Sequence, residues 1–128
     1  MKEKKLTIKI NKPVSAVFDF TTDPTNTPLW VPSIKAEKTN EWPVKKGSVY
    51  TNTSDGEKWD DYEVTEFEKD KMFTFSAKNS PYHVSYTFTS IKDGGCELEY
   101  FEWVDSGELE DPFTQNILDR LKELIEKN

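Results

Sequence analysis

The stretch KPVSAVFDFTTDPTNTPLWVPSI, residues 12–34, decides the fold of this chain. Pro13 suits the first turn of a helix, and the apolar residues that follow at spacings of three and one give that helix a single apolar face. Asp23 and Pro24 are residue types that cap and open a second helix, and we expect Pro28 to limit its length. The stretch therefore predicts two short helices in succession.

Strand signals lie on both sides of these helices. Before them, KLTIKI (5–10) alternates between apolar and polar residues, which is typical of a half-buried strand. After them come six strand-like runs: IKAEKTN (34–40), GSVYTNTS (47–54), WDDYEVTEF (59–67), KMFTFSAK (71–78), YHVSYTFTS (82–90) and CELEYFEW (96–103). Because strands joined by short turns pair with their chain neighbours, we expect an antiparallel meander.

The last stretch, DPFTQNILDRLKELIEKN (111–128), predicts a long amphipathic helix of roughly 17 residues, about 25 Å in length. We expect Asp111 to cap it and Pro112 to occupy its first turn. Its apolar stripe is worth on the order of 10 kcal/mol before entropy is subtracted, so the helix must pack on an apolar surface. The order of elements predicts one α+β domain over residues 1–128, with helices on one face of the sheet and water on the other.

The charge and composition of the chain argue against several classes of function. It has 24 Asp and Glu, 17 Lys and Arg and a net charge of −7, with Arg120 as its only arginine, so it lacks the clustered cations of a nucleic-acid-binding face. The single Cys96 allows no intramolecular disulfide, and we expect it to be a small packed residue. No segment has the length of a membrane span or the apolar core of a signal peptide, so we expect a cytoplasmic protein.

Motifs for metals and cofactors are also missing. The acid-rich run SDGEKWDDYE (54–63) does not have the spacing of a calcium loop, and we interpret it as a solvated hairpin. Neither of the glycine-rich motifs that hold phosphates or dinucleotides is present. We therefore expect no metal and no cofactor.

The sequence resembles the START-like or SRPBCC superfamily, which includes polyketide cyclases, coenzyme Q-binding and lipid-transfer proteins, and a family of pollen allergens. Three stretches carry the resemblance: residues 12–34, YEVTEFEKDKMFTFSA (62–77) and KDGGCELEY (92–100). It implies a helix-grip fold, in which a strongly bent seven-stranded antiparallel sheet wraps around the long C-terminal helix. It also implies a cavity for an apolar or amphipathic small molecule, which the short final helix here could leave modest or filled. It implies no particular activity, because the superfamily shares no universal catalytic motif.

Aromatic side chains on the inner face are the candidate ligand contacts. They are Trp30, Tyr50, Tyr62, Phe73, Phe75, Tyr86, Tyr100 and Phe113, with Ile117 and Leu121 from the last helix. The alternative is an ordinary core packed with aromatic rings, and for Phe73, Phe75 and Leu121 the sequence supports the two interpretations equally. For Trp30, Tyr86 and Tyr100 we favour the cavity, because a buried hydroxyl or indole N–H needs a partner that a plain core does not supply.

Candidates for acid–base chemistry are few. His83 is the only imidazole, but the alternation of its strand places Tyr82 and Tyr86 on the core face and His83 outside, which removes Ser–His and Cys–His schemes. Glu102 shares the inner face with Tyr100 if the last strand keeps strict alternation, and it would then be a weak candidate proton donor or ligand anchor. We favour the alternative, in which a bulge or the strand end turns Glu102 outward.

Three hypotheses about function follow. The leading one is a binding or carrier protein for a lipid-, polyketide- or quinone-like molecule, acting as a monomer or weak homodimer. The second is an enzyme resembling a cyclase, aromatase or hydrolase, working without metal through Glu102 and tyrosine hydroxyls. The third is a protein-interaction domain with a filled core, which an outer patch of Phe101 and Trp103 would favour.

Overall fold

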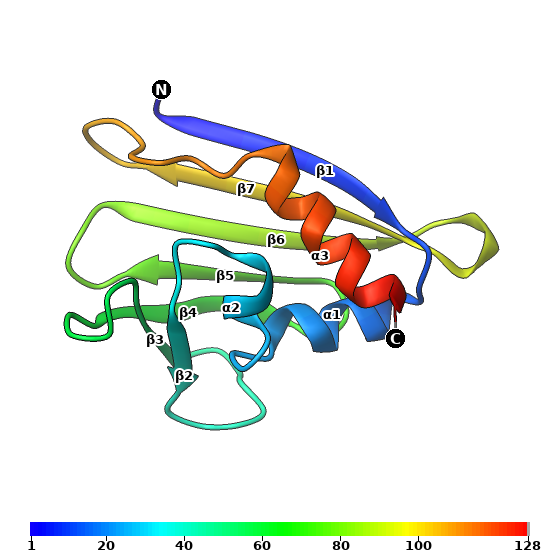
Figure 1. Ribbon diagram of the computed structural model, residues 1–128, viewed down its shortest axis with the longest axis horizontal. Helices are drawn as coiled ribbons and strands as arrows, with labels where there is room; N and C mark the ends of the chain where they lie inside the picture. The colour runs from blue at the N-terminus through cyan, green and yellow to red at the C-terminus, as the bar shows by residue number, and fades with distance from the viewer. Residues whose placement is uncertain (128) are drawn as a thin grey trace.

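Seven antiparallel strands form a single sheet in the computed structural model, which describes residues 1–127 (Figure 1). The strands are β1 (Glu3–Ile10), β2 (Ala36–Thr39), β3 (Val49–Thr53), β4 (Asp60–Glu68), β5 (Met72–Ala77), β6 (Tyr82–Ser90) and β7 (Cys96–Val104). Their order in the sheet is β1-β7-β6-β5-β4-β3-β2, so β2 to β7 form a meander and β1 pairs with β7. This confirms the predicted meander.

All three α-helices lie on the same face of the sheet (Figure 1). They are α1 (Val14–Thr22), α2 (Thr27–Trp30) and α3 (Gln115–Lys127), and one 3-10 turn, Lys92–Gly94, connects β6 to β7. Helix α3 packs against β1 and contacts both α1 and α2. This arrangement confirms the α+β class and the helix-grip fold that the resemblance implied.

The start of α2 differs from the prediction. The Asp23 carboxylate accepts hydrogen bonds from the backbone N–H and the hydroxyl of Thr25, at 2.9 and 2.7 Å, and so closes a local turn. Helix α2 begins only at Thr27, with Pro28 in its first turn. The prediction that Asp23 caps this helix and Pro28 limits it is therefore wrong, because the carboxylate is satisfied before the helix begins.

The start of α3 also differs. Asp111 has a φ of 49°, in the left-handed region, and the helix begins at Gln115. The backbone N–H of Phe113 donates to the Glu102 carboxylate at 2.7 Å, which ties this segment to β7 instead of a first helical turn. The described part of α3 is 13 residues, about 20 Å long. Asp111 is thus not its cap, and Asn128 lies outside the described residues.

A packed core lies between the sheet, α1 and α3. Leu118, Leu121 and Ile125 of α3 are buried in one apolar cluster with Val17 and Phe18 of α1. Cys96 is fully buried in the same cluster, which confirms it as a packed residue. No helix within residues 1–127 has the length and apolar character to cross a bilayer.

Candidate functional site

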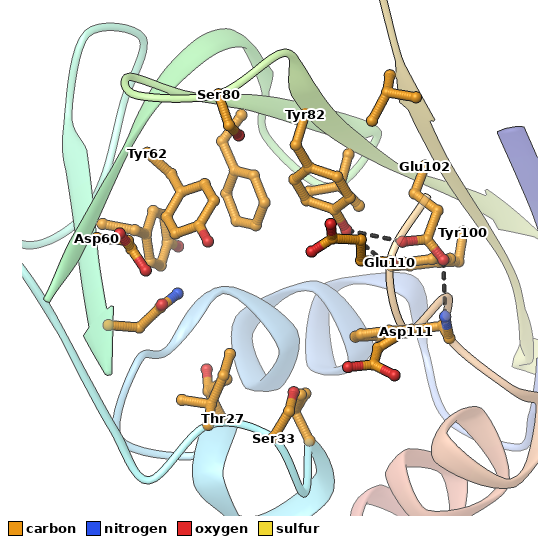
Figure 2. A pocket seen from close by; sticks show the side chains of 18 of the residues that line it. Thr27, Ser33, Asp60, Tyr62, Ser80, Tyr82, Tyr100, Glu102, Glu110 and Asp111 are labelled. Carbon is orange, nitrogen blue, oxygen red and sulfur yellow. Dashed lines mark hydrogen bonds between the residues drawn. The ribbon is translucent and has the colours of Figure 1, made fainter. Parts of the chain in front are cut away.

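A cavity of about 650 Å³ lies between the sheet, α2 and the segment that leads into α3. Its volume falls in the range of small-molecule sites, roughly 300–1,000 Å³. In Figure 2, Asp60 and Tyr62 of β4 lie on one side and Glu102 of β7 on the other, and Thr27 of α2 lies opposite the sheet. A filled core, which the interaction-domain hypothesis required, is therefore not what the structure shows.

Nine aromatic residues line the cavity. They are Trp30, Tyr50, Tyr62, Phe73, Phe75, Tyr82, Tyr86, Tyr100 and Phe113. Phe113 stacks on Tyr100 with ring centroids 4.3 Å apart, and Phe73 stacks on Tyr86 at 4.7 Å. Because each ring packs against its neighbours as well as facing the cavity, the wall is held in place without a ligand. Tyr82 is in this wall although the candidate contacts did not include it.

Glu102 is buried in the cavity wall, with 2% of its surface exposed. One carboxylate oxygen accepts from the Tyr82 hydroxyl at 2.8 Å, and the other accepts from the N–H of Phe113 at 2.7 Å. The Tyr82 hydroxyl also lies 3.1 Å from that of Tyr100 (Figure 2). The favoured interpretation, that Glu102 turns outward, is wrong: β7 keeps strict alternation, and two hydrogen-bond donors hold the buried carboxylate inside.

A second carboxylate, Glu37 of β2, lines the cavity near α2. It accepts from the Thr27 hydroxyl at 2.6 Å and from the Asn52 side-chain amide at 3.1 Å. Burial raises the pKa of Glu37, and these two hydrogen bonds only partly oppose that effect. Sequence reasoning missed Glu37 and its partners. The sequence carried no clear signal for it, because β2 has only four residues and Glu37 shares the face of Tyr50 and Asn52 through the register of β2 against β3.

The tyrosine hydroxyls of the wall are protonated donors. Burial, reinforced by nearby carboxylates, raises the pKa of Tyr50, Tyr62 and Tyr82 above the usual value of 10. The pKa values of Tyr86 and Tyr100 are raised in the same direction, again chiefly by burial. The Tyr50 hydroxyl donates to the Thr22 carbonyl at 2.6 Å. The wall thus presents neutral hydroxyls and no phenolate.

Trp30, at the end of α2, is 3% exposed and lines the cavity. Its ring meets Tyr86 and Phe113 edge to face, with centroids 6.4 and 6.0 Å away. Its indole N–H is buried and has no hydrogen-bond partner within the described chain. The packing of its ring against Tyr86 and Phe113 therefore makes Trp30 part of the cavity wall.

Two of the sequence-predicted contacts lie elsewhere. Leu121 is fully buried in the core between α1 and α3, and Ile117 lines a separate shallow groove beside Arg120. Neither lines the cavity, because the cavity ends at the segment that precedes α3, and the helix stripe faces the packed core. The prediction that Ile117 and Leu121 contact the ligand has no support from this geometry.

His83 lies on the outer face of the sheet, as predicted, and does not line the cavity. Its Nδ1 is 2.6 Å from the Ser76 hydroxyl, its Nε2 is 2.6 Å from the Asp105 carboxylate, and its ring stacks on Trp103. Ser76 lies in β5 directly opposite His83 of β6, so the contact between the two side chains crosses neighbouring strands on the outer face of the sheet. Among residues 1–127, no three His, Cys, Asp or Glu side chains gather closely enough to hold a metal ion.

Comparison with known proteins places this geometry in a family. The family described as polyketide cyclase/dehydrase and lipid transport matches residues 1–127. No curated protein matches the chain. Similar solved structures include a Thermobifida fusca protein, with TM-score 0.78 and 15% identity over 99% of this chain and 95% of that one. A Nitrosomonas europaea protein has TM-score 0.74 and 14% identity over 98% and 95%, and Ara h 8.0201 has TM-score 0.66 and 16% identity over 98% of both chains. The likeness to these structures is one of fold, and the family match decides membership: the chain belongs to the polyketide cyclase/dehydrase and lipid transport family, within the START-like superfamily.

Proposed function

We propose that this protein binds and carries a small apolar or amphipathic molecule in the cavity between the sheet and α2. The observation that carries the proposal is the cavity of about 650 Å³, walled by nine aromatic residues. Apolar walls with a few placed polar groups are the usual composition of a small-molecule site.

Binding can be tested by thermal unfolding in the presence of apolar and aromatic compounds of graded size. A compound at 100 times its Kd stabilises the folded state by about 2.7 kcal/mol, which raises Tm measurably. We expect compounds that fill the cavity to raise Tm, and Tyr86→Trp, which would occupy part of the cavity, to abolish the rise. The outer-face variant Trp103→Ala is the control and should respond like the parent protein. An unchanged Tm across the panel would contradict the proposal.

Catalysis is a second candidate, favoured by one observation. Glu102 lies in the cavity wall and accepts from the Tyr82 hydroxyl, which in turn contacts the Tyr100 hydroxyl. A carboxylate linked to phenol groups beside an apolar cavity is able to take and return a proton in a cyclisation or dehydration. In that case Glu102→Gln should abolish turnover of a polyketide-like substrate while the substrate still binds. If no turnover is found with any bound compound, carriage alone remains.

A further inference from the structure

Every charged side chain in the cavity wall is acidic. The charged residues are Glu37, Asp60, Glu102, Glu108, Glu110 and Asp111, and the described wall contains no Lys, Arg or His. The chain as a whole has 24 acidic and 17 basic residues, so composition alone does not explain this one-sided wall. Glu108 pairs with the amino group of Met1. Within residues 1–127, none of the other five has an ion-pair partner.

The two deeper carboxylates are held by neutral donors alone. Glu102 accepts from a phenol and a backbone N–H, and Glu37 accepts from a hydroxyl and an amide. These hydrogen bonds orient the oxygens but bring no positive charge to them. A buried carboxylate without a cation is costly, and a charge of opposite sign in the cavity would offset that cost.

The rest of the wall also favours a cation. Tyr62 lies between Phe75 and Tyr82, with ring centroids 5.4 and 6.5 Å away, and all three rings line the cavity. Aromatic faces attract ammonium groups, and the attraction strengthens in a site that excludes water.

We propose that the cavity selects an organic cation, a protonated amine or quaternary ammonium group on an apolar or aromatic body, and discriminates against carboxylates of the same shape. This rests on the proposed binding function and narrows it. In Figure 2, Asp60 at one side and Glu110 and Asp111 at the other surround the same space that Glu102 borders. Their combined field attracts a cation and repels an anion.

Three compounds with one body separate charge from shape: 2-(1-naphthyl)ethylamine, 2-(1-naphthyl)ethanol and 1-naphthaleneacetate. Calorimetric titration at neutral pH and low salt should give the amine at least about tenfold tighter binding than the alcohol, and the carboxylate the weakest binding. Equal affinity for all three, or a preference for the carboxylate, overturns the charge selectivity and leaves the binding function standing. If none of the three binds and none raises Tm, both proposals fail.

Variants assign the selectivity to the wall. Glu102→Gln keeps the shape of the side chain and should reduce the ratio of amine to alcohol affinity by about tenfold. Asp111→Asn removes a charge at the exposed rim of the cavity and keeps a residue type that tolerates the positive φ of this position. It should reduce the ratio of amine to alcohol affinity by a smaller factor, and it provides a test if the Glu102 variant folds poorly. Glu63→Gln removes the same charge from an exposed position of β4 outside the cavity, and its ratio should match the parent protein. A ratio that falls equally in all three variants overturns the assignment, since it would reflect net charge alone.

Discussion

Two substitutions of Glu102 separate the contribution of its charge to the free energy of unfolding from the contribution of its hydrogen bonds. Glu102→Leu removes both acceptor oxygens from a site that is 2% exposed. The N–H of Phe113 then has no partner, whereas the Tyr82 hydroxyl keeps its contact with Tyr100. Glu102→Gln retains one oxygen for Phe113, and its amide N–H can donate to Tyr82. The two variants therefore differ mainly in whether one partly buried backbone donor is satisfied.

The expected magnitudes follow from these contacts. A buried donor left unpaired costs about 1–3 kcal/mol, and loss of the charge-assisted bond from Tyr82 adds about 1 kcal/mol. We expect Glu102→Leu to lower the free energy of unfolding by about 2–4 kcal/mol. Glu102→Gln should change it by less than about 1 kcal/mol, because the lost hydrogen-bond strength is offset by removal of a buried charge that has no cation.

Urea unfolding at neutral pH measures both values, and hydrogen exchange at the Phe113 amide locates the effect. In Glu102→Leu this amide should exchange faster than in the parent protein, while in Glu102→Gln it should stay protected. Val84→Ala, which truncates another buried residue of the cavity wall, is the control for general loosening. If Glu102→Gln is as destabilising as Glu102→Leu, the ionised carboxylate itself stabilises the fold and the reasoning is refuted.

Three further outcomes follow from the same structure. Trp30→Ala should abolish ligand-induced stabilisation. Leu121→Ala is a core truncation that costs about 2–5 kcal/mol of unfolding free energy, but the folded variant should keep a ligand Kd within about twofold of that of the parent protein. Equal losses of affinity in the two variants would place Trp30 in the core instead of the cavity wall. Burial raises the pKa of Glu37 in the folded chain, so its contribution to the free energy of unfolding should be fully present below its ordinary pKa of 4.5 and be lost as pH rises through the higher folded value. Urea unfolding across that pH range should show a smaller fall for Glu37→Gln than for the parent protein. An equal fall in both proteins would contradict the raised pKa of Glu37. Trp103→Ala loses the stacking on His83 and Phe101, so urea unfolding should show a free energy of unfolding lower by about 1–3 kcal/mol, with the ligand Kd unchanged. A changed Kd would show that the outer face is coupled to the cavity.

The strands and the inner-face aromatics were predictable because their signal is local. The period of two in β6 and β7 placed Tyr86 and Tyr100 inside and His83 outside, and the structure agrees. The same period placed Glu102 inside, but a carboxylate there is credible only if donors are known. One of those donors, the N–H of Phe113, comes from a segment 11 residues away. A pattern along one strand carries no information about such a partner.

The remaining errors have the same origin in tertiary contacts. The apolar residues of α3 form one continuous stripe in the sequence. This pattern does not indicate which of them face the cavity, so it could not predict that the cavity ends before the helix and that Leu121 lies in the core. The predicted start of α3 failed because Glu102 holds the Phe113 amide out of the first turn. Glu37 escaped notice because β2 has only four residues, too few for alternation to stand out.

The pairing of β1 with β7 has a consequence for how the chain folds. Strands β2 to β7 can form one hairpin at a time from neighbouring segments, but Glu3 of β1 lies opposite Trp103 of β7. Because long loops close slowly, we expect this pairing to be among the late events of folding. Helix α3 packs on β1, so the helix has no complete surface to dock on until that strand is in place. On the ribosome, β1 emerges before its partner β7, and we expect it to stay an unpaired amphipathic strand for the roughly five to twenty seconds that synthesis of the next hundred residues takes.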